Sequence, residues 1–357
     1  MDDRHRDTNL TEIMPYAAIS SQPNDLGMPL KNARECLEEQ QIKIYFAAVA
    51  SAAVIGLLIP GTTALEEGIN AALALMLFVT FLQVPLADLG RAFSRVRFLF
   101  ALLLANFVAV PALVAGLIQF LPAEPLVRLG VLLVLLTPCI DYVVTFSHIG
   151  RADARLLLAA TPALLLVQML LLPIYLRFFL GSDAANLVQA GPFIHAFVWL
   201  IAVPLALAAL VQVWAARSRT GERAAAALGL LPVPATALVL FVVIAAVVPQ
   251  LGPAIEVVLS VVPIYIAFAI AAPLIGWCIA RLFRIDVAAG RAVAFSAGTR
   301  NSLVVLPLAF AVPGAVPVLP AIIVAQTLVE LVSELIYLRL MPKLGKTAST
   351  KSQAPSR

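Results

Sequence analysis

Two short polar motifs interrupt long apolar stretches of this sequence and carry the residues most able to do chemistry. They are Thr137-Pro138-Cys139-Ile140-Asp141 and Gly298-Thr299-Arg300-Asn301-Ser302. Proline lacks a backbone donor and glycine relaxes the backbone, so we expect helix breaks at Pro138, Gly298 and Thr299. Irregular backbone inside a membrane survives only where it is buried in protein or lines a polar cavity. The two motifs therefore predict a solute or ion site.

The two motifs place one negative and one positive side chain at membrane depth. An isolated charge at the bilayer centre costs roughly 3 kcal/mol or more, so we expect Asp141 and Arg300 to face inward and to interact. We expect the two side chains to pair where the two breaks cross. In that position Asp141 can carry a proton or coordinate a cation during transport. A static pair that only locks the crossing stays open as the alternative.

The same motifs supply the predicted substrate-binding side chains. Cys139 offers sulfur, which soft metalloids prefer, and Arg300 offers positive potential. The amide of Asn301 and the hydroxyls of Ser302 and Thr137 can bind a polar solute. The alternative for Cys139 is that a buried cysteine is an inert, small apolar residue.

The last apolar stretch carries a second candidate for ion coupling. Gln326, Glu330, Ser333 and Tyr337 follow one another at helical spacing and share one face. Glu330 lies near the middle of the span and is a candidate for proton or cation coupling, with simple interhelical hydrogen bonding as the alternative. Glu334 lies nearer the end of the span, and we expect it to pair with a basic residue.

The elements that position these motifs belong to an all-α integral membrane protein. The chain of 357 residues is 62% hydrophobic and 12% charged, with a mean hydropathy of +1.00. About 20 apolar residues span a bilayer, which gives ten predicted transmembrane helices between a polar tail (1–41) and a basic tail (341–357). The predicted spans are 42–60, 69–89, 98–121, 126–147, 156–180, 193–215, 230–249, 255–279, 292–312 and 317–340.

Basic residues predict the orientation of these spans. They gather in alternate loops and in the C-terminal tail, while 61–68, 250–254 and 313–316 contain no Lys or Arg. Because positively charged loops stay in the cytoplasm, both termini are predicted to be cytoplasmic.

The broken spans are the fourth and the ninth, which are the fourth members of two five-helix halves, 42–180 and 193–340. An odd number of helices in each half gives the halves opposite orientation. This is the inverted-repeat plan of secondary transporters, in which discontinuous helices cross near the midplane.

Several function classes lack their motifs in this sequence. None of its three histidines begins a His-Glu-x-x-His motif, and it has no Gly-x-Ser-x-Gly elbow. It has no phosphate loop either, because Gly345-Lys346-Thr347 lacks the glycine that the motif requires five residues earlier, where Leu340 stands. We therefore expect no enzyme activity, no cofactor and no resident metal. The basic residues are spread over short loops, which does not favour nucleic-acid binding.

At both breaks the chain resembles the bile acid:sodium symporter superfamily, including its arsenite permease branch. The motif from Pro138 to Phe146 carries the resemblance together with Gly298 to Ser302. The resemblance implies a core of helices 3–5 and 8–10 beside a panel of helices 1, 2, 6 and 7, and a functional role for Cys139. The sequence departs from the sodium symporters because Arg300 replaces an amide and Ser296 stands near the place of a sodium-binding glutamate.

From these observations and this resemblance we predict a proton-coupled secondary transporter in the lipid bilayer of a bacterial inner (cytoplasmic) membrane. Its predicted activity is export of arsenite or a related trivalent metalloid oxyanion. Sodium is the less favoured coupling ion, because a fixed cation stands where sodium binds in the relatives. One alternative is sodium- or proton-coupled symport of an organic anion, whose carboxylate or sulfonate Arg300 would bind. An alternative from another class is a membrane receptor or scaffold without transport.

Overall fold

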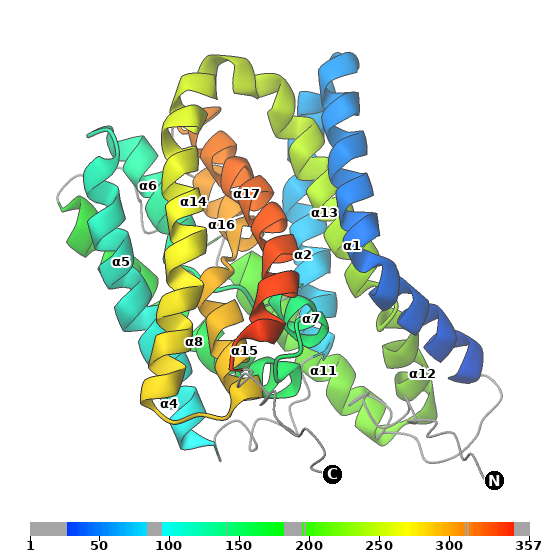
Figure 1. Ribbon diagram of the computed structural model, residues 1–357. Helices are drawn as coiled ribbons and strands as arrows, with labels where there is room; N and C mark the ends of the chain where they lie inside the picture. Colours follow the sequence, from blue (N-terminus) through cyan, green and yellow to red (C-terminus); the bar gives the residue numbers. More distant parts are fainter. Residues whose placement is uncertain are drawn as a thin grey trace, which may run out of the picture.

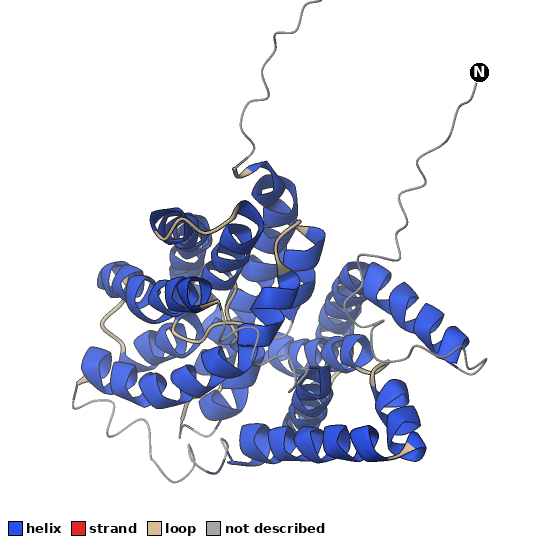
Figure 2. Cartoon of the chain, turned by 90° about the horizontal axis from the view of Figure 1, so that it is seen from below, coloured by secondary structure: helices blue, strands red, loops and turns tan. Residues whose placement is uncertain are grey.

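A computed structural model of the chain describes residues 27–83, 95–140, 142–181, 195, 198–310, 312 and 314–345. Within these residues every regular element is a helix, and the only β pairing is one isolated bridge (Figure 2). The prediction of an all-helical membrane protein is confirmed, since seven of these helical segments are long and apolar enough to cross a bilayer. They are Asn32–Leu58, Thr62–Gln83, Val96–Phe120, Ala154–Leu180, Pro232–Gln250, Ala254–Leu282 and Val318–Lys343.

The helices differ in how continuous they are. The long ones are α1 (Gly27–Leu58), α2 (Glu66–Gln83), α8 (Ala154–Leu180), α11 (Val203–Arg217), α13 (Pro232–Val247), α14 (Leu251–Leu282) and α17 (Val318–Leu340). The third predicted span is α4 (Val96–Leu104), a π-helical turn η5 (Ala105–Ala109) and α5 (Val110–Leu117). Short helices and turns fill the rest: η3 (Thr62–Leu65), η6 (Ile118–Phe120), η7 (Val198–Ala202), α12 (Arg219–Leu228), η8 (Val248–Gln250) and η9 (Met341–Lys343).

The first helix begins earlier than the sequence pattern predicts. We assigned residues 1–41 to a polar tail, whereas α1 already begins at Gly27. Its first half is polar but rich in good helix formers, and Arg34 pairs with Glu38 one turn later at 2.6 Å. Hydropathy locates the apolar part of a helix and gives no information about such a polar extension.

Both polar motifs interrupt a helix. In the first, α6 (Pro125–Leu135) ends before the motif and α7 (Tyr142–Ile149) follows it. In the second, α15 (Val287–Gly298) ends inside the motif and α16 (Ser302–Phe310) begins at its last residue. Each predicted span 126–147 and 292–312 is therefore a pair of half-helices. Asp141 lies outside the described residues.

The helices pack in two groups, which Figures 1 and 2 show side by side. In one group α13 packs on α1 and α2, and α11 packs on α2. In the other, α14 packs on α15 and α17, while α17 also contacts α6 and α16. The groups meet where α13 contacts α17 and where α2 contacts α16. Both interrupted helices belong to the second group.

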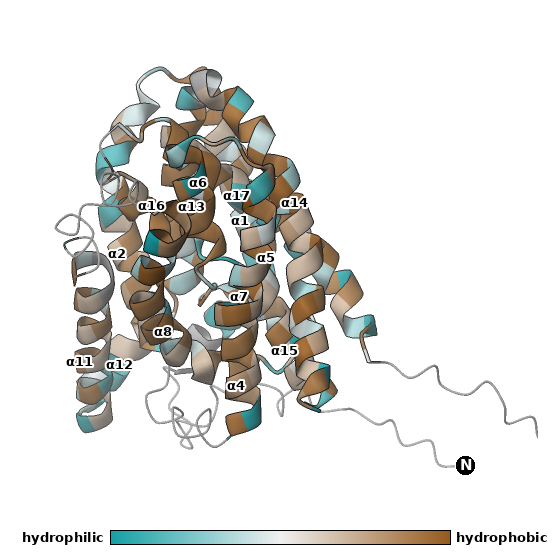
Figure 3. Cartoon of the chain, turned by 90° about the vertical axis from the view of Figure 1, so that its left-hand side faces the viewer, coloured by the Kyte–Doolittle hydropathy of each residue, from teal (hydrophilic) through white to brown (hydrophobic). Residues whose placement is uncertain are grey.

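The fold has an apolar exterior and a polar centre. Large apolar side chains such as Phe120, Phe178 and Leu282 are 76–79% exposed, and apolar colour dominates the outer helices in Figure 3. In contrast, Arg300 and Glu334 are completely buried. This distribution fits lipid outside and a polar site inside.

Close packing of α14 against α15 holds the second half-helix pair in place. A Cβ atom added at Gly276 would lie 2.8 Å from Ala297 Cβ and 2.9 Å from the carbonyl oxygen of Val293. We expect Gly276→Ala to destabilise the protein by about 1–3 kcal/mol, because the two backbones must move apart. The measurement is the thermal transition of the detergent-solubilised chain.

Gly116→Ala is the matched control, since no described atom lies within 4 Å of a Cβ added there. An unchanged transition for both variants would contradict the close-packing argument.

Candidate functional site

The two interruptions meet and satisfy each other's backbone groups. Pro138 and Arg300 form an antiparallel bridge. On either side of it, Cys139 N–H donates to the carbonyl oxygen of Thr299 at 3.1 Å, and Asn301 N–H donates to that of Thr137 at 2.8 Å. An unpaired backbone group in hydrocarbon costs several kcal/mol, so this crossing lets both helices break inside the bilayer.

Threonine side chains finish the half-helices that lead into the crossing. The Thr137 hydroxyl lies 2.9 Å from the carbonyl oxygens of Leu133 and Val134 in the last turn of α6. Thr299 is extended (φ −105°, ψ 130°), and its hydroxyl lies 2.7 Å from the carbonyl oxygen of Phe295 in α15. These hydroxyls add donors to the carbonyls of the last helical turns, where Val134 O and Phe295 O also accept the backbone N–H groups of Thr137 and Thr299.

The Arg300 guanidinium lies at the ends of both half-helices. Its Nη1 donates to Leu135 O at the end of α6 at 3.3 Å, and its Nη2 lies 2.5 and 2.8 Å from Ser296 O and Ala297 O of α15. Nη2 also lies 2.8 Å from Asn106 Oδ1 in η5. A helix C-terminus carries partial negative charge, so two helix dipoles converge on this cation. Protein oxygens therefore solvate both Nη groups of the completely buried guanidinium, while its Nε has no hydrogen-bond partner among the described residues.

Glu330 binds the backbone of the second break. Its Oε2 accepts the Arg300 backbone N–H at 2.7 Å and the Gln326 side-chain amide at 2.6 Å. The Tyr142 hydroxyl at the start of α7 contacts Oε1. Glu330 is 3% exposed. It therefore holds α17 and α7 against the break, through the backbone N–H of the residue that carries the guanidinium.

Glu334 has a different environment from the predicted one. We expected a pair with a basic residue near the end of the span. Instead its side chain is completely buried, and Oε1 lies 2.5 Å from Thr299 Oγ1. The prediction was wrong because position along α17 does not reveal that the end of α15 packs at this level.

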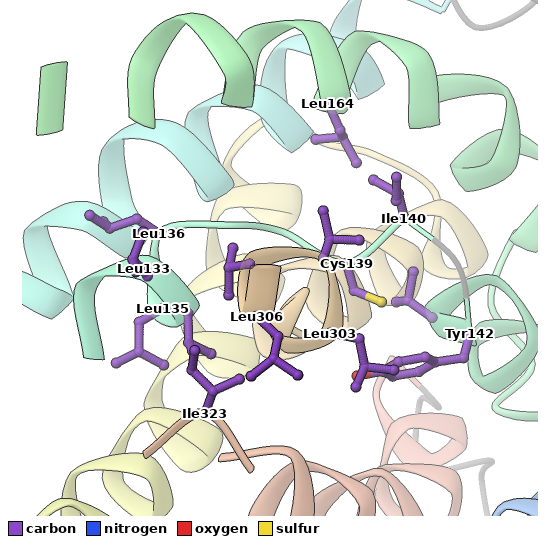
Figure 4. Packing of buried hydrophobic residues seen from close by; sticks show 14 of the residues in the cluster. Leu133, Leu135, Leu136, Cys139, Ile140, Tyr142, Leu164, Leu303, Leu306 and Ile323 are labelled. Carbon is purple, nitrogen blue, oxygen red and sulfur yellow. The ribbon is translucent and has the colours of Figure 1, made fainter. Parts of the chain in front are cut away.

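The other predicted site residues also lie at the crossing. Cys139 is completely buried, and Figure 4 shows it among Leu303, Leu306 and Ile140. Asn301 is 1% exposed, yet neither atom of its amide has a hydrogen-bond partner among the described residues. Ser302 Oγ, in contrast, accepts from the Thr327 hydroxyl at 2.9 Å. A buried amide without partners is unusual and marks a place where a polar solute can bind.

A small cavity adjoins Glu330 on the side of α14 and has room for about one water molecule. The hydroxyl of Tyr265 and Oε1 of Gln326 have no partner among the described residues. The residues that line the cavity are Leu135, Tyr265, Phe268, Ala269, Gly298, Gln326, Val329 and Glu330.

Sequence reasoning did not assign Asn106 to the site. Its side chain accepts from Arg300 and donates to Ser296 Oγ at 3.0 Å. The Phe268 ring lies 5.5 Å from the Arg300 guanidinium carbon and adds a cation–π contact. An asparagine within an apolar span is a signal of burial, but the sequence gives no indication of its partner.

A protein-family model described as "Sodium Bile acid symporter family" matches residues 70–254, just over half of the chain. The match includes the first break and Asn106, and it ends before Arg300. No curated protein matches the chain significantly.

The Asn106–Arg300 contact makes a testable contribution to stability. Asn106→Leu removes an acceptor from a buried cation, and hydrogen bonds to charged groups contribute about 1.5–3 kcal/mol. We expect a loss of stability of that size, measured as the thermal transition of the protein in detergent.

The control is Gln119→Leu on the same span, because Gln119 is exposed and the hydrogen bond described for its amide, at 3.3 Å, goes to Ala115 O of the same span. Equal transitions for the two variants would mean that Asn106 does not stabilise the guanidinium.

Proposed function

This chain belongs to the sodium bile acid symporter family and is a multi-pass membrane transporter, and we propose that it couples protons to the export of arsenite or a related trivalent metalloid oxyanion. Family membership implies a transported solute and a coupling ion. The identity of both is inferred here from the residues at the crossing.

The proposal rests on one observation, which is that the Arg300 guanidinium is bound at the C-terminal ends of two half-helices. In transporters with broken helices, the C-terminal ends of half-helices coordinate the coupling cation. Here the ends of α6 and α15 already coordinate Arg300 through Leu135 O, Ser296 O and Ala297 O. A fixed cation at this position makes sodium unnecessary and repels it. We therefore assign coupling to protons, with Asp141 and Glu330 as the titrating groups.

The chemistry next to the break suits a metalloid hydroxide. Arsenite is largely the uncharged As(OH)₃ at neutral pH, with a soft central atom and three hydroxyl groups. The Cys139 sulfur is a soft ligand beside the break, and Asn301 offers a buried amide without partners. Thr137 and Ser302 provide neighbouring hydroxyls, and Arg300 provides positive potential without contacting the solute.

We also propose the full ten-span topology for this chain, as two inverted five-helix halves with both termini in a bacterial cytoplasm. The antiparallel bridge between the two breaks supports opposed halves. The two helix groups support a core beside a panel. Figure 1 shows that the start of α4, the basic helix α12 and the connection from α14 to α15 lie at the same end of the molecule, which supports a cytoplasmic face there.

The second candidate is symport of an organic anion, which the family match favours. Arg300 would bind a carboxylate or sulfonate, and for this its Nη atoms must leave their present partners. The receptor or scaffold alternative has no observation in its favour.

The role of Cys139 can be tested in everted membrane vesicles that accumulate arsenite under an imposed pH gradient. We expect Cys139→Ser to reduce the initial rate at least tenfold, because oxygen is a poorer ligand than sulfur for arsenic(III). Cys278→Ser is the control, since Cys278 lies exposed on α14.

Wild-type vesicles that accumulate no arsenite would refute the export proposal. Equal transport rates for Cys139→Ser and Cys278→Ser would show that the Cys139 sulfur does not bind the transported arsenic.

The coupling ion can be tested by replacing sodium with potassium or N-methylglucamine. We expect the arsenite accumulation rate to change by less than twofold, because Arg300 occupies the cation position. Taurocholate uptake in the same membranes tests the second candidate. Sodium-dependent taurocholate uptake together with no arsenite transport would favour organic anion symport instead.

A further inference from the structure

The buried carboxyl group of Glu334 has no part in the coupling described above. One of its oxygens contacts Thr299 Oγ1, and the other has no hydrogen-bond partner among the described residues. The ion pairs found in the described part of the chain are Arg34–Glu38 and Arg95–Asp286, so none involves Glu334. An ionised Glu334 would be a buried charge with a single hydrogen bond, which is costly.

The contacts of the Thr299 hydroxyl indicate which group carries the proton. Thr299 Oγ1 lies 2.7 Å from Phe295 O and 2.5 Å from Glu334 Oε1. A hydroxyl has one proton, and a carbonyl oxygen can only accept. When Thr299 donates to Phe295, its contact with Glu334 is a hydrogen bond only if the carboxyl group is protonated and donates. When Glu334 is ionised, Thr299 must donate to it and give up the bond to Phe295.

Charge balance at the crossing leads to the same assignment. Two N–H groups donate to Oε2 of Glu330, those of Arg300 and Gln326, which suits an ionised carboxylate. An ionised Glu330 supplies one negative charge at the residue that carries the positive guanidinium. A second ionised carboxylate one turn along α17 would be uncompensated and would repel Glu330.

Residues from several helices surround Glu334 and Glu330 on α17. The Tyr337 ring packs edge-on against Phe295, with 6.2 Å between ring centroids, and its hydroxyl contacts Ala269 O of α14. Within the described ranges, the titratable or charged groups around this part of α17 are Glu330 and Tyr337 of α17 itself and three groups that contact or adjoin Glu330. Those three are Tyr142 of α7, Tyr265 of α14 and Arg300 of the break.

We propose that Glu334 is a proton-carrying residue of the transport cycle. In the closed crossing it holds a proton, and Thr299 donates to Phe295. When water reaches the contact between α17 and the second break, the O–H bond of Glu334 breaks and water accepts the proton. Thr299 then turns its hydroxyl proton from Phe295 O toward the carboxylate, which stays in contact with it. Glu334 takes up a proton from water by the reverse of these steps. Each cycle therefore releases one proton from Glu334 and returns one to it. This inference rests on the proposed proton coupling.

The first test is infrared spectroscopy of the purified full-length protein in lipid nanodiscs. We expect the wild-type spectrum to contain the C=O stretch of a protonated carboxylic acid that is lost in Glu334→Gln and that shifts in D₂O. The glutamine amide can still donate to Thr299, so the fold should be retained. The control is Glu256→Gln on α14, whose exposed side chain should leave this band unchanged.

The second test is arsenite transport in proteoliposomes. We expect Glu334→Gln to lose at least tenfold in accumulation driven by a pH gradient, and to lose far less in arsenite–arsenite exchange at equal pH. Normal gradient-driven accumulation would overturn the proposal, as would a band that persists in Glu334→Gln or does not shift in D₂O. If wild type transports no arsenite, the proposed function fails, and the infrared result alone decides whether Glu334 carries an exchangeable proton.

Discussion

The buried guanidinium of Arg300 is the constraint on which the rest of the structure depends. A cation in a bilayer needs a shell of oxygens, and a continuous helix has no free carbonyls to offer. Both half-helices supply them because each ends at the crossing, where Leu135 O, Ser296 O and Ala297 O converge on one side chain. The breaks and the charge thus require each other: the charge neutralises two helix ends, and the helix ends solvate the charge.

This arrangement limits how the surrounding helices can pack. α14 must approach α15 closely, which Gly276 permits, and it brings Phe268 over the guanidinium. α17 must present a carboxylate to the Arg300 backbone, which Glu330 does. The third span contributes Asn106 from a π-helical turn, a type of helix irregularity that is frequent at functional sites.

The sequence predicted the charge, the two motifs and the helical membrane fold, because apolar length and buried charge are local signals. It did not predict partners. The predicted pair of Arg300 with Asp141 stays a prediction, because Asp141 lies outside the described residues. The partners that the structure describes for Arg300, which are Asn106 and backbone carbonyls, were not predicted. Glu334 was expected to pair with a basic residue, and it lies buried against Thr299. Which helix faces reach one crossing depends on packing between residues about 190 positions apart, as for Asn106 and Arg300, and no local pattern encodes it.

A fixed cation also changes what a transport cycle must do. A sodium symporter can empty its cation site, and that event allows the crossing to rearrange. Arg300 cannot leave, so the crossing keeps one positive charge throughout, and only the carboxyl groups around it can change the local charge. With Glu330 bound to the Arg300 backbone, a neighbouring acid can balance the site only by binding or releasing a proton. The proposed proton coupling therefore places the coupling step at carboxyl protonation instead of at the binding of a mobile cation.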